Sequence, residues 1–164
     1  MNDSGRRKQS INTRDPWLVT GRNKPAVDNW LRELASNRRP FSALLMRKIP
    51  IFNSKDNNKE VLANLCEFEV PIPRAVWYIK MLAAYNSAMS EMNKTKKRPQ
   101  HPDPSQDWTH ALTRYLRDQL QEILTSNNDE MRVESSVPFK QWSYSLELCE
   151  HMYNQGLLGM YNCL

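Results

Sequence analysis

The side chains best suited to metal chemistry in this sequence are Cys149, His151 and Cys163, which lie close together near its end. Cysteine and histidine are the usual zinc ligands, but three of them at this spacing match no familiar zinc pattern. Cys149 also falls on an apolar stripe of helical period, which is typical of a cysteine in a hydrophobic core. We therefore expect no metal site here.

His110 is the residue best placed for proton transfer, because Asp107 and Arg114 lie one turn away from it on a predicted helix. A solvated helix face gives the same spacing, and we take that as the better interpretation. The sequence has 4 glycines in all, so neither a Gly-rich phosphate loop nor a nucleophile elbow can be written from it. We predict that the protein is not an enzyme, and we expect no cofactor and no small-molecule substrate.

Positive charge is concentrated in the first part of the sequence. Residues 1–98 hold 19 Lys/Arg against 9 Asp/Glu, a net charge of +10, and residues 99–164 hold 4 against 9, a net charge of −5. A basic first part favours an acidic partner, which is a nucleic acid, a phosphorylated protein or an acidic protein surface. The sign of the charge does not choose among these three.

Cysteine usage and hydropathy indicate a reducing compartment, the cytosol or the nucleus. The three cysteines are odd in number and unevenly spaced, which is not the pattern of a disulfide framework. The polar start of the sequence holds no apolar leader segment, and no apolar run is long enough to span a membrane. We expect no association with a membrane.

Apolar periodicity predicts an all-α protein, an irregular multi-helix domain preceded by a disordered basic arm of residues 1–15. The predicted helices span about Pro25–Ala35, Phe41–Lys48, Lys59–Phe68, residues 73–92, Pro104–Leu124 and Pro138–Asn154. Their stripes carry four tryptophans that we expect to be largely buried, Trp30, Trp77, Trp108 and Trp142.

The helix over residues 73–92 is apolar nearly all round, which predicts a central, buried helix. Val76, Ile79, Leu82 and Ala83 cover most of the faces that its regular stripe leaves. A regular apolar stripe also runs along each of the two later helices, and that of the helix after Asp103 is expected to face inward. These stripes are Trp77, Met81, Ala84, Tyr85, Ala88 and Met92; Trp108, Leu112, Tyr115, Leu116, Leu120 and Ile123; and Phe139, Trp142, Leu146, Cys149 and Tyr153.

Local signals mark the ends of the last two helices. Asp103 is a predicted N-cap, because Pro104 suits the first helical position and Gln106 the third. Ser136 is the predicted N-cap of the last helix, and Gly156 is expected to end it.

Two basic clusters are candidate binding sites. In the arm, Arg6, Arg7 and Lys8 can meet acidic groups, and Trp17 beside them is either a packing anchor or a partner contact. Between two predicted helices, four residues have the minimal form of a nuclear import signal, although a solvated linker explains them equally well. These four residues are Lys94, Lys96, Lys97 and Arg98.

The same clusters support an alternative function, a basic helical module that binds nucleic acid through its phosphates. Five tryptophans in a basic sequence also suit base stacking. Four of the five fall on apolar helical stripes, however, so core packing is the better explanation for them. We therefore do not expect direct nucleic-acid binding.

Many segments together resemble, in order and at similar spacing, one known family over about residues 4–158. They are Gly5–Lys8, Trp17–Thr20, Asn29-Trp30, Lys48–Phe52, Val70-Pro71, Arg74–Met81, Ala83–Tyr85, Lys96–Arg98, Asp103-Pro104, Trp108, Tyr115-Leu116, Gln119–Gln121, Gln141-Trp142 with Tyr144, and Gly156–Leu158. The family they resemble is Mediator complex subunit 12, in its N-terminal region. That subunit is the scaffold of the Mediator kinase module.

The resemblance implies a nuclear, non-enzymatic regulator of RNA polymerase II transcription. It also implies binding to cyclin C, to the Mediator-associated cyclin-dependent kinase and to other subunits of the kinase module. The corresponding organisation is a basic arm over 1–15, a subunit 12-like helical domain over 16–93, a basic linker over 94–102, a continuing helical region over 103–158 and a truncated tail over 159–164.

Two departures from the family lead us to expect a fragment, or a truncated gene model, of a far larger protein. The family's kinase-activating segment precedes the stretch that matches Gly5–Lys8, and the family continues with more helices after the stretch that matches Gly156–Leu158. We therefore expect this chain to bind the cyclin–kinase pair without activating the kinase.

Overall fold

The computed structural model describes residues 17–19, 24–45, 48–52, 56–92, 103–126 and 137–159, and within them the protein is all-α apart from two short strands. The elements are β1 (Trp17–Val19), α1 (Lys24–Ala35), α2 (Phe41–Leu45), β2 (Ile49–Ile51), α3 (Asn57–Glu67), α4 (Ile72–Met92), α5 (Pro104–Ser126) and α6 (Val137–Asn154). The predicted fold class is confirmed.

Two of the three predicted helix-end signals are confirmed, at Asp103 and at Gly156. The Ser105 amide donates to Asp103 Oδ1 at 3.0 Å, so Asp103 caps α5 as predicted. Gly156, with φ of 70°, ends α6 in a Schellman motif: its own amide donates to Tyr153 O, and the Leu157 amide donates to Met152 O. The predicted cap at Ser136 lies outside the described residues.

The two strands, which the sequence did not predict, form a two-stranded parallel sheet in which Trp17 lies opposite Ile49 and Val19 opposite Ile51. Pro50, in the middle of β2, lacks an amide hydrogen, which is tolerated at the edge of so small a sheet. Its carbonyl accepts a 2.7 Å hydrogen bond from the buried Tyr78 hydroxyl of α4. The strand pair is therefore fixed to the helical body through α4.

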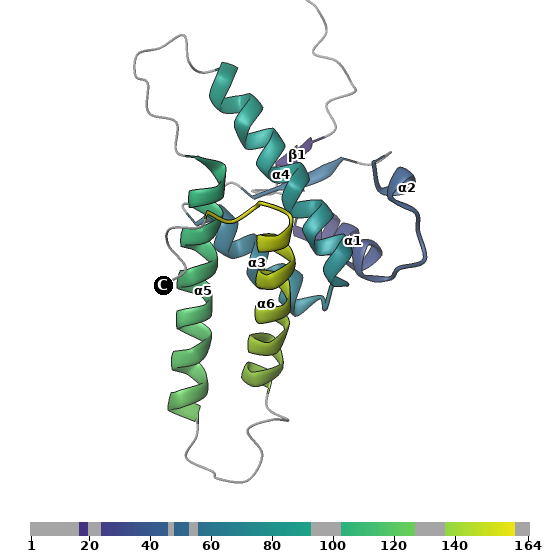
Figure 1. Ribbon diagram of the computed structural model, residues 1–164. Helices are drawn as coiled ribbons and strands as arrows, with labels where there is room; N and C mark the ends of the chain where they lie inside the picture. The colour runs from purple at the N-terminus through teal and green to yellow at the C-terminus, as the bar shows by residue number, and fades with distance from the viewer. Residues whose placement is uncertain are drawn as a thin grey trace, which may run out of the picture.

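Helices α3, α5 and α6 pack together, with α5 and α6 lying side by side in opposite directions (Figure 1). One continuous core joins them to α1 and α4, and its fully buried members include Leu31, Leu65, Tyr78, Trp108 and Met152. The segment after α6 returns to α5, where the Gly159 amide donates to Thr109 Oγ1 at 2.9 Å. Residues on both sides of the 94–102 stretch thus belong to one hydrophobic core.

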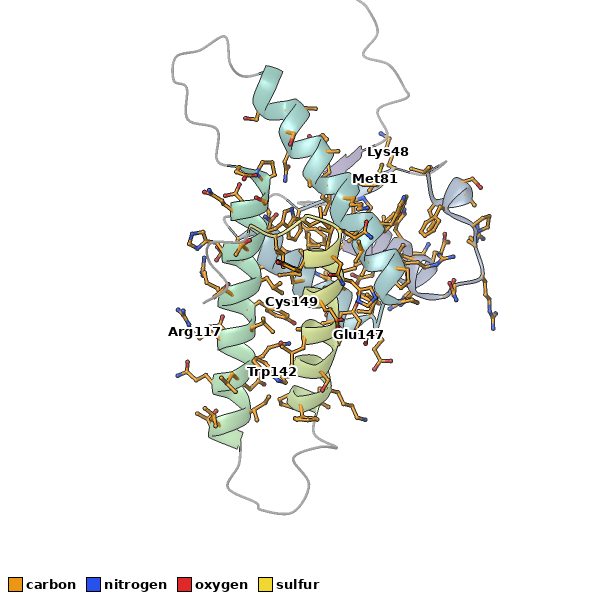
Figure 2. The ribbon with its side chains drawn as sticks, viewed as in Figure 1. Lys48, Met81, Arg117, Trp142, Glu147 and Cys149 are labelled. Carbon is orange, nitrogen blue, oxygen red and sulfur yellow. The ribbon has the colours of Figure 1, made fainter. Side chains whose placement is uncertain are left out.

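Burial of the tryptophans is a partial correction. Trp30 and Trp108 are buried as predicted, at 3% and 1% exposed, whereas Trp77 and Trp142 are only partly buried. Trp142 lies in the first half of α6, on the side toward α5 (Figure 2). Few elements surround these two positions, so a wide indole ring cannot be covered there on every side.

The predicted stripes on α5 and α6 are also partly wrong. Leu120 of α5 and Leu146 and Tyr153 of α6 are exposed. The α6 side chains that are buried instead are Ser145, Leu148 and Met152, one residue out of register with the prediction. A shift of one residue turns a helix by about 100°, so the inward face differs from the most regular apolar stripe.

Helix α4 is central only in its first half. Ala75, Val76, Tyr78, Ile79 and Leu82 are buried, but no residue described after Leu82 in this helix is. The second half extends beyond the packed body (Figure 1). The prediction of a central, buried helix therefore holds only for the first half of α4, where the side of Val76, Ile79 and Leu82 is buried and the side of Trp77 is only partly covered.

Candidate partner-binding surface

Most of the side chains predicted from sequence to bind partners lie outside the described residues. These are Arg6, Arg7, Lys8, Lys94, Lys96, Lys97 and Arg98. Trp17 is the exception, because its backbone begins β1 and pairs with Ile49. The structure therefore links the region next to the arm to β2, and the roles of all eight residues stay predictions.

Arg74 is a buried cation that joins three elements, a role that sequence reasoning missed. Its guanidinium donates to Asn37 Oδ1 at 2.9 Å, to Leu34 O at 3.3 Å and to Arg39 O at 2.5 Å. These acceptors lie at the end of α1 and in the loop after it, where the helix dipole favours a positive charge. Its Cζ also lies 5.1 Å from the centre of the Phe41 ring of α2. We interpret Arg74 as a structural connector, because its guanidinium is buried and donates to α1 and to the loop that follows α1.

The outer face of α4, which we define as Trp77, Met81, Ala84 and Ala88, points away from the buried side of that helix. Ala84 and Ala88 are exposed, and Trp77 and Met81 are only partly covered by the core. The four residues follow one another at spacings of four, three and four, which places them in one row. This row is apolar, and the described part of the chain leaves much of it exposed to solvent.

Aromatic contact extends the outer face of α4 onto α2. The rings of Phe41 and Trp77 are 4.8 Å apart between centroids, with their planes tilted by 37°. Phe41 and Leu45 lie on the same side of the short helix α2, and both are exposed, at 38% and 45%. Together the two helices present large apolar side chains, an arrangement that usually marks an interaction surface.

Positive side chains border this surface. Arg38 and Arg39 immediately precede the start of α2 and are exposed, and Lys80 is exposed between Trp77 and Ala84 on α4. The sequence from Ile72 to Ser90 contains no Asp or Glu. The nearby carboxylate of Glu33 is 4.0 Å from Arg39 Nε, a long ion pair of a kind that contributes little, and the Arg39 side chain is half exposed.

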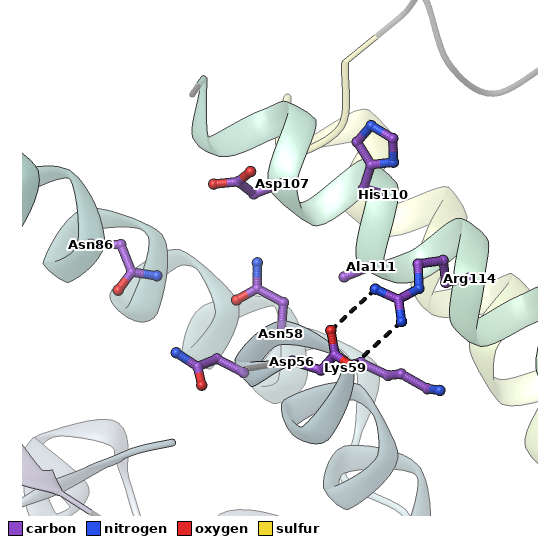
Figure 3. A pocket seen from close by; sticks show the side chains of 9 residues that line it. Asp56, Asn58, Lys59, Asn86, Asp107, His110, Ala111 and Arg114 are labelled. Carbon is purple, nitrogen blue, oxygen red and sulfur yellow. Dashed lines mark hydrogen bonds and ion pairs between the residues drawn. The ribbon is translucent and has the colours of Figure 1, made fainter. Parts of the chain in front are cut away.

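A polar cleft of about 450 Å³ lies between the starts of α3 and α5 and the second half of α4 (Figure 3). Arg114 of α5 spans part of it to reach Asp56, at 3.1 Å and 3.4 Å. His110 and Asp107 also line the cleft, and His110 is exposed, as a solvated helix face predicts. Its charges are largely balanced, so the cleft shows no preference for a ligand of one sign.

A neighbouring ion pair joins α3 to α5 in the same way. Lys59 Nζ lies 2.5 Å from Asp118 Oδ2, and this hydrogen bond lowers the pKa of the Asp118 carboxyl. Lys59 and Asp118 are both open to solvent, so the pair contributes little stability. The charged groups around the cleft thus pair across α3 and α5, while the buried core supplies the main contact between these helices.

The cysteines are structural where they are described. Cys66 is buried between α3, α5 and α6, its thiol lies 3.6 Å from Gln141 O, and burial raises the pKa of that thiol. Cys149 is partly buried against the core, close to the predicted core position. His151 is exposed, and Nδ1 of its ring lies 2.9 Å from Glu147 O. Among the described residues no group of three His, Cys, Asp or Glu side chains could hold a metal ion.

None of the helices in the described part of the chain is both long and apolar enough to cross a membrane.

Comparison with known families matches residues 10–80 to "Transcription mediator complex subunit Med12". These residues include β1, α1, α2, β2, α3 and the start of α4. The match therefore covers Phe41 and Leu45 of α2 and the first residue of the outer face of α4, Trp77.

Comparison with known proteins gives relatives over nearly the whole chain. The human "Mediator of RNA polymerase II transcription subunit 12-like protein" is 41% identical over 172 residues, and the human "Mediator of RNA polymerase II transcription subunit 12" is 36% identical over 176 residues. Both alignments cover 99% of this chain and 8% of the relative. The Drosophila melanogaster subunit 12 is 39% identical over 132 residues, covering 78% of this chain and 5% of the relative. No solved structure matches this chain.

Proposed function

Because this chain belongs to the Mediator subunit 12 family, we propose that it acts in the nucleus as a non-catalytic part of the Mediator complex that regulates RNA polymerase II transcription. In finer terms, we propose that it scaffolds the cyclin C–cyclin-dependent kinase pair within the Mediator kinase module and contacts other subunits of that module. The chain spans about 8% of the length of the human relatives it matches. The proposal concerns only the contribution of this region.

The pairing of β1 with β2 is the observation that carries this proposal. It attaches the segment that follows the basic arm to a strand that is itself bonded to buried Tyr78. A partner held by the arm is then coupled to the helical body through the backbone pairing of these two short strands. A scaffold needs such a coupling, because it has to hold one partner at a fixed place relative to another.

The proposed contact with the cyclin–kinase pair uses Arg6, Arg7, Lys8 and Trp17. Guanidinium groups bind carboxylates in a bidentate manner, so the arginines suit an acidic surface. Each exposed charge pair contributes only about 0.2–1 kcal/mol, so useful affinity requires several of them. A tryptophan is the residue type that most often dominates an interface, and Trp17 is proposed to supply that anchor.

We expect the purified chain to bind the purified cyclin–kinase pair, and the triple change Arg6→Ala, Arg7→Ala and Trp17→Ala to weaken that binding at least about tenfold, or 1.4 kcal/mol. The measurement is a calorimetric titration of the chain into the cyclin–kinase pair, and substrate phosphorylation is measured in the same samples. Phosphorylation is expected to stay near the basal level of the pair.

The matched control removes positive charge elsewhere, through Arg117→Ala and Lys140→Ala, which are exposed on α5 and α6. This double variant is expected to bind like the unchanged chain. Equal weakening by both sets would reduce the arm to a source of general charge. Binding that survives the triple change intact would remove the arm from the interface, and strong stimulation of phosphorylation would contradict the absence of activation.

The alternative function, a nucleic-acid-binding module, predicts a different response to salt. Phosphate contacts release counterions, so DNA affinity would fall steeply between low and physiological salt. We expect weak DNA binding at physiological salt, alongside stable binding to the cyclin–kinase pair. Submicromolar DNA affinity at that salt with no binding to the pair would reverse the assignment.

Lys94, Lys96, Lys97 and Arg98 are proposed to contribute to nuclear import. We expect the chain, fused to a reporter too large to diffuse into the nucleus, to lose most of its nuclear accumulation when all four become Ala. The control changes four dispersed basic residues to Ala, which are Lys24, Arg38, Arg117 and Lys140. Equal nuclear accumulation in both variants would mean that the cluster is a solvated linker.

A further inference from the structure

We propose that the outer face of α4, together with Phe41 and Leu45 of α2, binds an acidic amphipathic helix of a partner protein. The proposal concerns side chains other than those of the arm, so it does not depend on the cyclin–kinase contact.

The first argument is the pattern of burial along α4. A helix that is apolar nearly all round is normally covered on all sides. Here the core covers the side that contains Ala75, Tyr78 and Leu82, while Ala84 and Ala88 on the opposite side remain exposed. On that opposite side the core and the Phe41 ring cover Trp77 and Met81 only in part. A partner surface accounts for the apolar character of the part that stays exposed.

The shape of the outer face of α4 favours a helix as the partner. Trp77, Met81, Ala84 and Ala88 form one row along the helix, and rows of this kind pack against the grooves of a second helix. Large side chains stand at one end of the row and small ones at the other. The two alanines allow the partner backbone to approach closely, while the Phe41–Trp77 pair provides a wide aromatic anchor.

The charge of the border favours an acidic partner. Arg38, Arg39 and Lys80 are exposed beside the surface, and α4 has no carboxylate from Ile72 to Ser90. Lys80 donates to Gln155 of the segment after α6, a neutral acceptor that leaves its charge uncompensated. Like charges across an interface are unfavourable, so a second copy of this chain is a poor occupant, whereas Asp and Glu beside an apolar stripe complement it.

The test uses the full chain and a fluorescently labelled helical peptide of about five turns, ~18 residues, with Leu and Ala on one face and Glu on both flanks. A matched peptide carries Lys in place of every Glu. We expect saturable binding of the Glu peptide, measured by fluorescence anisotropy and weakened by added salt. The Lys peptide is expected to bind at least about tenfold more weakly.

Two variants of the chain locate the site. Ala88→Glu places bulk and negative charge in the row and is expected to weaken binding of the Glu peptide at least about tenfold, or 1.4 kcal/mol. Asn86→Glu makes a similar change two residues away, on a different side of the same exposed stretch of helix. It is expected to change affinity less than about twofold, because its side chain points away from the row. Thermal unfolding followed by circular dichroism checks that both variants remain folded.

Several results would overturn the proposal. They are the absence of saturable binding by the Glu peptide, equal binding of the Glu and Lys peptides, and equal effects of Ala88→Glu and Asn86→Glu. Sedimentation that shows a concentration-dependent dimer, abolished by Ala88→Glu, would assign the surface to a second copy instead.

Discussion

Replacing Trp108 with Ala is expected to lower the free energy of unfolding by about 3–5 kcal/mol, the usual loss when a fully buried aromatic ring is removed. Trp108 is 1% exposed and belongs to the core that α5 shares with the other helices. Its removal leaves a cavity that the surrounding helices can close only in part. The loss can be measured by urea unfolding, with far-ultraviolet circular dichroism as the signal.

Trp77→Ala is the informative comparison for this prediction. Trp77 is partly exposed and lies on the outer face of α4, so its removal is expected to reduce the free energy of unfolding by only about 1–2 kcal/mol. The same chemical change at two sites then separates a core tryptophan from a surface one. Equal losses at the two sites would contradict the burial that the structure assigns to them.

Replacing Arg74 with Met is expected to lower the free energy of unfolding by about 2–4 kcal/mol, because hydrogen bonds to charged groups contribute about 1.5–3 kcal/mol each and buried acceptors are left unpaired. The affected acceptors include the carbonyls of Leu34 and Arg39. Methionine occupies a similar volume and preserves much of the packing, so the change removes mainly the donors and the charge.

Arg74→Lys is the matched control, because it retains the positive charge but not the planar arrangement of donors. We expect an intermediate loss of stability, measured by the same urea unfolding. A Met variant as stable as the unchanged protein would mean that burial of the charge cancels its hydrogen bonds, as happens for some buried ion pairs. In that case Arg74 would not be the connector between α1, α2 and α4.

The Arg74→Met variant also bears on the proposed binding surface. Arg74 contacts Phe41, and Phe41 contacts Trp77, so the position of α2 against α4 depends on this chain of contacts. A loss of α2 docking in the Arg74→Met variant would weaken the aromatic anchor of the outer face of α4. Binding of the acidic helical peptide should therefore decrease in that variant, even under conditions where the helical core remains folded.

Local sequence determined the helices and several of their ends. Asp103 before Pro104 fixes the start of α5, and Gly156 fixes the end of α6, because capping depends on residues within a few positions of each other. The burial of Trp30 and Trp108 also follows from short-range periodicity. The chemistry of a few neighbouring residues is sufficient for features of this kind.

Tertiary structure alone decided which side of each apolar helix is covered. On α4 almost every side is apolar, so periodicity cannot choose between the side of Tyr78 and the side of Trp77; the packing of the other helices makes that choice. On α6 the small Ser145 is buried, with its hydroxyl satisfied by a hydrogen bond to Gln141 O within the helix, while Leu146 is exposed. Hydrophobicity by itself predicts the reverse.

Contacts between residues far apart in the chain likewise could not be predicted from local sequence. The pairing of Trp17 with Ile49 depends on how α1 and α2 bring the two strands together, and the three acceptors of Arg74 lie 35 to 40 positions before it in the chain. Such contacts form only when the whole core is assembled, because the entropy lost in closing long loops is offset by burial elsewhere. For the same reason, the outer face of α4 became visible as a candidate site only once the core was known to lie on the opposite side of that helix.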